Sequence, residues 1–117
     1  CHTLEMAKWS FTSHSRAWES LINHPIKNST KNPECIACHT TGFGQTGGFG
    51  EPTTSNIRKF KAVQCETCHG PMKGHPQDDG VHPTPITEET CIGCHDDANS
   101  PDFEFSKYLR LATCQSK

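Results

Sequence analysis

The pentapeptides CIACH at residues 35–39, CETCH at 65–69 and CIGCH at 91–95 share one form, C-x-x-C-H, and decide how this chain folds. Two thiols separated by two residues on a helical turn can reach neighbouring pyrroles of one porphyrin edge, and the next histidine then points at the iron. C-x-x-C-H is accordingly the attachment site of c-type haem. The motifs predict three covalently bound haems, with thioether bonds from Cys35, Cys38, Cys65, Cys68, Cys91 and Cys94 and iron ligation by His39, His69 and His95.

Paired cysteines also occur in three other kinds of site. Zinc ribbons use two C-x-x-C pairs for each metal, and three pairs do not divide into such sites. A disulfide framework and a thioredoxin-like redox motif are the remaining alternatives. None of the three gives a reason for a histidine after every pair, so the sequence favours haem.

The first two residues, Cys1-His2, have the form of the end of a fourth motif. We therefore expect an N-terminus that is incomplete or processed, a fourth haem bound to Cys1, and His2 on its iron. Two alternatives for Cys1 are a lipid-modified N-terminal cysteine and a disulfide with Cys114, the other cysteine outside the complete motifs.

Four further histidines would give four irons two imidazoles each: His14, His24, His75 and His82. His14 shares a helical stripe with Trp18, Leu21 and Ile22, whereas the other three each precede a proline and so leave helical backbone. We expect all four to be distal iron ligands, the alternative for any one being a solvated loop histidine. The sequence does not assign them to haems, although a short connection to His69 indicates that His75 serves another haem.

The remaining patterns predict a mainly α chain with long loops. A helix in two pieces is expected over residues 3–23, and Asn32-Pro33 and residues 85–89 carry start signals for helices ahead of two motifs. A further helix is expected over 59–69, and another from Ser100-Pro101-Asp102 to about residue 111. Residues 41–54 are predicted to be a loop, and no stretch alternates like a strand.

The composition explains why haem would be needed for folding. Only 32% of the 117 residues are hydrophobic and the mean hydropathy is -0.69, so side chains alone give a poor core. We expect one tetrahaem domain over residues 1–117, its core formed by stacked haems. Aromatic residues are available to pack against them: Trp9, Trp18, Phe43, Phe49, Phe60, Phe103, Phe105 and Tyr108. A formal charge of -2 argues against nucleic-acid binding, and no apolar run approaches the ~20 residues of a membrane span.

The residues around the motifs resemble the cytochrome c-554 family of multihaem cytochromes. The matching stretches are Trp9-Ser10 with Ser13-His14, residues 38–43, residues 63–71 with His75, and residues 100–105 with Tyr108. The resemblance implies a tetrahaem electron carrier with haems in close pairs, His14 and His75 as distal ligands, and one haem that can be five-coordinate. The incomplete first motif and the tail ending in Ala112-Thr113-Cys114 depart from the family's pattern.

An iron held by two imidazoles has no vacant position for a substrate, which favours electron transfer over catalysis. We expect a carrier that relays electrons between redox protein partners in the periplasm, at the cell surface or outside the cell. A filament of haem-stacked copies is one form such a carrier can take. The alternative is a small reductase of nitrogen or sulfur compounds that uses one five-coordinate haem.

Overall fold

The computed structural model describes residues 2–112, so the predicted roles of Cys1 and Cys114 lie outside the described residues. The elements in this part of the chain are α1 (Thr3–Ser10), η1 (His14–Arg16), α2 (Ala17–Ile22), η2 (Ser29–Lys31), α3 (Pro33–His39), α4 (Thr54–Phe60), α5 (Cys65–His69), α6 (Glu88–Ile92) and α7 (Phe105–Ala112), where η marks a 3-10 helix. Within residues 2–112 the β structure is limited to an isolated bridge between Thr40 and Lys61. The predicted class, mainly α with long loops, is confirmed.

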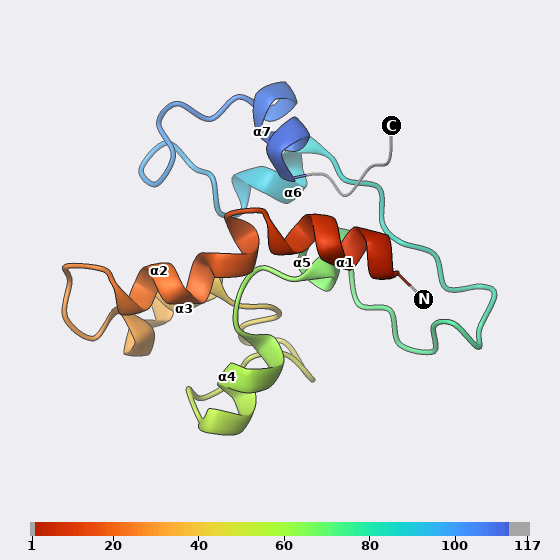
Figure 1. The fold of residues 1–117 in the computed structure, drawn as a ribbon, viewed down its shortest axis with the longest axis horizontal. Helices are drawn as coiled ribbons and strands as arrows, with labels where there is room; N and C mark the ends of the chain where they lie inside the picture. The colour runs from red at the N-terminus through yellow and green to blue at the C-terminus, as the bar shows by residue number, and fades with distance from the viewer. Residues whose placement is uncertain (1, 113–117) are drawn as a thin grey trace.

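The predicted N-terminal helix forms in two pieces that cross the middle of the molecule (Figure 1). α1 ends as the Phe11 amide donates to the Lys8 carbonyl, and η1 then leads the chain into α2. Trp18 and Leu21 are buried as the helical stripe predicts. Ile22 was expected on the same stripe and is 62% exposed, because α2 ends there and the chain turns outward.

A small side-chain core lies between α2, α3 and the loop after α3. It consists of Trp18, Leu21, Ile36 and Phe49, with the Trp18 and Phe49 ring centroids 5.6 Å apart. The radius of gyration is 14.5 Å, whereas a compact domain of this length has about 13 Å. The polypeptide is therefore more open than its length requires, and this cluster is a modest core for it.

The helix predicted over residues 59–69 is wrong as a single element. The chain leaves α4 at Lys61, passes through Ala62 with a φ of 73°, and enters α5 only at Cys65. Backbone hydrogen bonds hold this break: the Thr41 amide donates to Phe60 at 2.9 Å, and the Ala62 amide donates to His39 at 3.1 Å. These bonds join residues 60–62 to the end of α3. They therefore keep the chain from continuing as a helix between α4 and α5, although the local sequence favours one.

The C-terminal helix also begins later than predicted. α7 starts at Phe105, so Ser100 is not its N-cap, and the backbone over 100–103 forms a turn instead. α6 and α7 lie together on one side of the α1–α2 arm, and α4 lies on the other (Figure 1). The segment between α5 and α6 extends as a long loop that carries His75 and His82.

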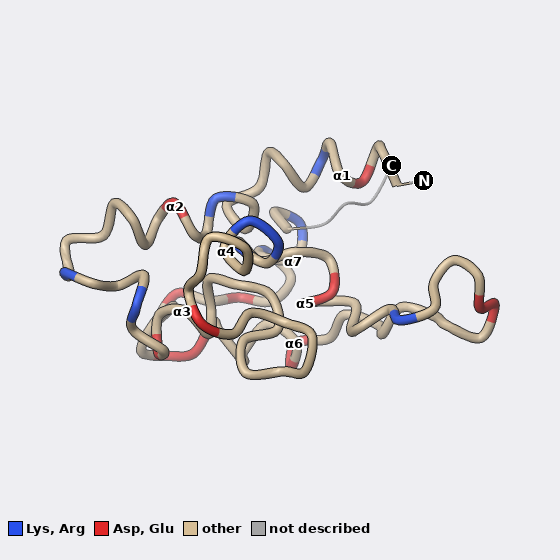
Figure 2. Tube along the Cα trace, turned by 90° about the horizontal axis from the view of Figure 1, so that it is seen from below, with Lys and Arg blue, Asp and Glu red and all other residues tan. Residues whose placement is uncertain are grey.

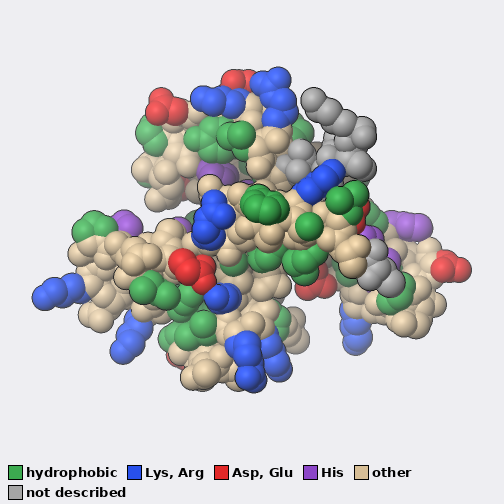
Figure 3. Space-filling view, viewed as in Figure 1, with side chains coloured by type: hydrophobic (Ala, Val, Ile, Leu, Met, Phe, Trp, Pro, Cys, Tyr) green, Lys and Arg blue, Asp and Glu red, His purple; other side chains and the backbone are tan. Residues whose placement is uncertain are grey.

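Lys, Arg, Asp and Glu residues are spread along most of the chain, as the coloured Cα trace in Figure 2 shows. The space-filling view in Figure 3 shows hydrophobic and histidine side chains at the surface between the charged side chains. Several large hydrophobic side chains are exposed, among them Leu4, Met6, Phe11, Ile22, Ile26, Ile92 and Leu111. Of the helices within residues 2–112, none is both long and apolar enough to cross a lipid bilayer.

Candidate haem sites

Each complete motif lies on a short helix or in the turn that continues it. The first motif lies on α3, which has Asn32 as its N-cap and Pro33 in its first turn. The second motif, residues 65–69, makes up the whole of α5. The third begins on α6, and amides of Cys94 and His95 both donate to the Cys91 carbonyl at 3.1 and 2.9 Å. All three therefore have the helical turn that C-x-x-C-H spacing requires.

Thiols of the three complete motifs approach one another. The pKa of Cys94 is raised to about 12, first by burial and then by the neighbouring thiols of Cys38 and Cys68. Burial, with a smaller contribution from Glu88, also raises the pKa of Cys91. None of the six motif cysteines forms a disulfide, and residues 2–112 contain no group of three or more His, Cys, Asp or Glu side chains placed to hold a metal ion alone.

The imidazole of His39 is oriented by α2. Its Nδ1 lies 2.6 Å from the Ala17 carbonyl oxygen and 3.1 Å from the Ser20 hydroxyl. A carbonyl accepts only, so Nδ1 carries the proton and Nε2 keeps its lone pair. This is the tautomer that an iron ligand needs, and metal-bound histidines usually donate their other ring N–H to an acceptor in this way.

The imidazole of His95 has the most complete surroundings of the three. Its Nδ1 lies 2.8 Å from the Ser100 hydroxyl. The Phe103 ring stacks on it with centroids 5.4 Å apart, and the Tyr108 ring meets it edge-on at 5.2 Å. Sequence reasoning assigned Ser100 to a helix cap and Phe103 and Tyr108 to general packing; nothing in the local sequence distinguishes their contact with His95.

His69 lacks such a partner. Its Nδ1 is buried and makes no hydrogen bond among the described residues. Its carbonyl accepts from the Thr84 amide at 2.8 Å, which brings the loop after α5 back against the motif. Gly70 makes this close approach possible, since it has a φ of 77° and a Cβ there would lie 2.8 Å from the Thr84 hydroxyl.

Two pairs of histidine rings from distant parts of the chain lie close together. The ring centroids of His2 and His75 lie 5.9 Å apart, and those of His14 and His95 lie 6.1 Å apart. A bond from metal to imidazole nitrogen is about 2 Å long, so two imidazoles on opposite sides of one iron hold their ring centroids roughly 6 Å apart. Both centroid separations are close to this value, and the ring planes are inclined by 26° for His2 with His75 and by 49° for His14 with His95.

Burial favours the neutral form of one of these pairs. It lowers the pKa of His14, which the nearby His95 lowers further, and it also lowers the pKa of His95. Neutral imidazole is the form that binds a metal. The His2 and His75 side chains are exposed, and Nδ1 of His2 lies 4.0 Å from the Glu5 carboxylate.

The other two predicted distal ligands are not brought to a motif histidine. His24 is exposed, and its Nδ1 accepts a hydrogen bond from the Ile26 amide at 3.2 Å, which leaves its proton on Nε2. His82 is exposed in the loop that returns to α5. Ligation by these two histidines stays a prediction, as does ligation by the motif histidines themselves.

Comparisons with known proteins agree with this arrangement. The sequence profile described as "Cytochrome c554 and c-prime" matches residues 1–70. Cytochrome c-554 of Nitrosomonas europaea is 34% identical over 83 residues, which cover 61% of this chain and 34% of that protein, so the chain spans about a third of its relative's length. The solved structure of reduced cytochrome c554 from the same organism has the same fold, with a TM-score of 0.72 at 22% identity over 94% of this chain and 77% of that one.

The matched profile spans the half motif at residues 1–2 and the complete motifs at 35–39 and 65–69. It covers more than half of the sequence. The chain belongs to the cytochrome c554 and c-prime family of multihaem cytochromes.

Proposed function

We propose that this chain is an electron carrier that holds three or four c-type haems, most of them with histidine on both faces of the iron. Bound haem iron supplies a one-electron oxidation and reduction between its ferric and ferrous states. The protein's own groups would attach the porphyrins, fix the imidazoles and keep substrates away from the iron.

The spacing of the two histidine pairs carries this proposal. His95 follows the third cysteine pair, and His14 faces it at the centroid distance of two axial ligands. His2 follows Cys1, and His75 faces it in the same way. We assign His14 to the haem of residues 91–95 and His75 to the haem of the first, partial motif. The second assignment agrees with the expectation that His75 serves a haem other than that of His69.

His39 and His69 leave room for the alternative function. Within residues 2–112 no second histidine ring packs against either of them, whereas His2 and His95 each have one. An iron with one open face can bind a small molecule, which would suit a reductase of nitrogen or sulfur compounds. The remaining histidines, His24 and His82, are the predicted ligands that would close these faces.

The cellular role follows from the haems and from the family. Carriers of this kind relay electrons between redox proteins, and we place this one in the periplasm, at the cell surface or outside the cell. Stacking of copies into a filament would extend the relay from one molecule to the next.

An intact mass and an electron paramagnetic resonance spectrum of the ferric protein test the proposal together. The mass rises by about 0.6 kDa for each bound haem, and we expect three or four such increments. Low-spin signals support ligation by two imidazoles, and a high-spin signal that cyanide abolishes indicates an open face. A colourless protein with the mass of the bare chain would refute the proposal.

Single substitutions test the pairing. We expect His14→Ala and His75→Ala each to convert one low-spin haem to high spin. His24→Ala and His82→Ala test in the same way whether these two histidines close the faces opposite His39 and His69, and each should likewise convert one low-spin haem to high spin if it does. Unchanged spectra in both of the first two variants would exclude the assigned pairs while leaving the haem count intact.

A further inference from the structure

The three motif histidines differ in what their Nδ1 atoms contact. Nδ1 of His39 has a backbone carbonyl at 2.6 Å, Nδ1 of His95 has the Ser100 hydroxyl at 2.8 Å, and Nδ1 of His69 is buried without a partner among the described residues. The three attachment motifs are otherwise nearly the same in sequence. The three histidines thus belong to the same kind of attachment motif, but their imidazoles differ in the hydrogen bonds that Nδ1 makes.

This difference has a direct electronic consequence for an iron ligand. An imidazole that donates its Nδ1 proton to an acceptor gains partial negative charge and becomes a stronger electron donor through Nε2. A stronger donor stabilises ferric iron more than ferrous iron, so it lowers the reduction potential. Hydrogen bonding at Nδ1 is therefore one means by which a chain with repeated motifs can give its haems different potentials.

Ser100 is held firmly enough to act in this way. Its amide donates to the Asp96 carbonyl at 2.7 Å, and its carbonyl accepts from the Phe103 amide at 2.9 Å. Both backbone groups are therefore fixed, and the hydroxyl is not used to cap α7, which begins five residues later. The Phe103 and Tyr108 rings confine the imidazole of His95 from two further directions.

We propose that Ser100 is a positioning residue for the haem of residues 91–95: by accepting a hydrogen bond from the Nδ1–H group of His95 it directs Nε2 to the iron and lowers the reduction potential of that haem. The proposal rests on the proposed function, since it requires haem at this motif. It assigns to Ser100 a role in setting the order in which the haems are reduced. The corresponding influence is absent at His69, within the part of the chain that the structure describes.

An optical redox titration of the haem-loaded protein tests the proposal. We expect Ser100→Ala to shift one reduction step to a more positive potential, by up to about tenfold in its equilibrium constant, which is about 59 mV for one electron. Ser100→Thr keeps a hydroxyl and should restore the original value. Ser106→Ala is the matched control, because the Ser106 hydroxyl bonds to Glu104 and to no histidine.

The identity of the shifted step is checked with His14→Met, which exchanges the ligand opposite His95. The step moved by Ser100→Ala should be the one that His14→Met moves furthest. A fully haem-loaded Ser100→Ala protein with every potential unchanged would refute the role of Ser100 and leave the proposed function standing. An equal shift of all potentials, or a shift that Ser100→Thr does not reverse, would also refute it. A wild-type protein without haem would instead refute the proposed function.

Discussion

Thr41 joins the first two motifs through one buried hydroxyl group. The hydroxyl donates to the Ala62 carbonyl at 2.9 Å and accepts from the Gln64 amide at 3.0 Å, and the Thr67 hydroxyl lies 3.3 Å away. Thr41→Val keeps the shape and removes these bonds, so the Gln64 amide at the start of α5 loses its partner. We expect the free energy of unfolding to fall by about 1–3 kcal/mol, measured by denaturant titration of the haem-loaded protein.

Thr41→Ser is the control for that prediction. It keeps the hydroxyl and removes one methyl group, which should cost about 1 kcal/mol. If the valine variant were as stable as the wild type, the hydroxyl network would contribute nothing to joining the motifs.

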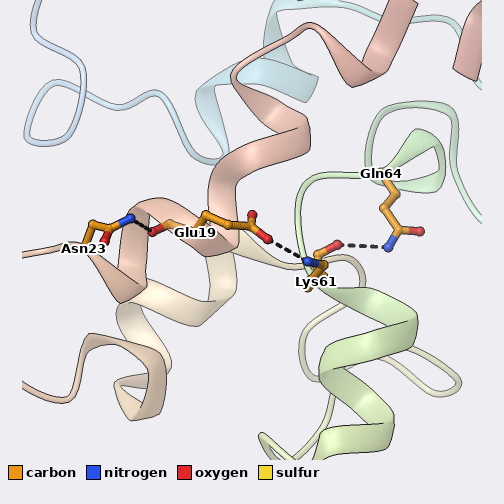
Figure 4. Close-up of polar contacts among 4 residues, drawn as sticks. All are labelled: Glu19, Asn23, Lys61 and Gln64. Atoms are coloured by element: carbon orange, nitrogen blue, oxygen red, sulfur yellow. Dashed lines mark hydrogen bonds and ion pairs between the residues drawn. The ribbon is translucent and has the colours of Figure 1, made fainter. Parts of the chain in front are cut away.

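Lys61 and Glu19 form an ion pair between the break after α4 and helix α2 (Figure 4), with Nζ and Oε1 2.6 Å apart. The hydrogen bond from Lys61 lowers the pKa of Glu19 from 4.5, so the unfolded chain binds the proton more readily. The stabilisation is complete above about pH 4.5 and disappears as the pH falls through the lowered pKa. Because both side chains are more than 40% exposed, we expect Glu19→Gln to cost no more than about 1 kcal/mol at pH 7.

Urea unfolding at several pH values measures this effect. The difference between Glu19→Gln and the wild type should shrink to zero towards pH 3, and Lys61→Met should show the same loss at pH 7. A difference that persists unchanged at pH 3 would mean that the glutamine acts through packing and not through charge.

At the scale of elements, the start of α3 is defined by Asn32. Its side chain accepts a hydrogen bond from the Glu34 amide at 3.0 Å, and Pro33 occupies the first turn. Asn32→Ala removes the cap and should lower the free energy of unfolding by about 1 kcal/mol. Asn32→Asp keeps an acceptor at the positive end of the helix and should be neutral. Equal stabilities of the alanine and aspartate variants, measured by denaturant titration, would contradict a capping role.

Helix starts were predicted correctly where the signal lies in the neighbouring sequence. The predictions were wrong where the helix boundary depends on contacts with distant residues. The Asn32-Pro33 cap is confirmed, and so is a helix start within residues 85–89, at Glu88 after the Thr87 cap. The break at Lys61–Gln64 was missed because it depends on hydrogen bonds to residues about twenty positions earlier. Ser100 was misassigned for the same reason, since its hydroxyl serves the side chain of His95 and not a helix.

For the whole molecule, the sequence predicts the attachment motifs and not their partners. Cys and His spacing is a local pattern, so the three motifs and the predicted distal histidines can be read directly. Which histidine faces which depends on how the 70–86 loop and the α1–α2 arm return to the motifs. The pairs His2 with His75 and His14 with His95 join residues far apart in the chain, and no local spacing encodes them.

The balance of buried and exposed side chains predicts how the chain behaves without haem. Its core cluster consists of four side chains, whereas large hydrophobic side chains such as Phe11, at 83%, and Leu111, at 70%, are exposed. Haem surfaces would add apolar contacts that this polypeptide cannot supply. We therefore expect haem-free protein to keep part of its helical circular dichroism, to bind the dye ANS strongly and to melt without a cooperative transition. Haem-loaded protein should melt cooperatively and bind little ANS.

A graded variant separates a general need for haem from the loss of one site. Cys65→Ala with Cys68→Ala removes covalent attachment at α5 alone, and this protein should lie between the haem-loaded and haem-free forms in dye binding and melting temperature. The intact mass verifies that one haem of about 0.6 kDa is missing. A haem-free chain that melts cooperatively at the temperature of the loaded protein would show that the cluster around Trp18 and Phe49 suffices for folding. The fold would then be stable without bound haem, and the low hydrophobic content of the chain would need another explanation.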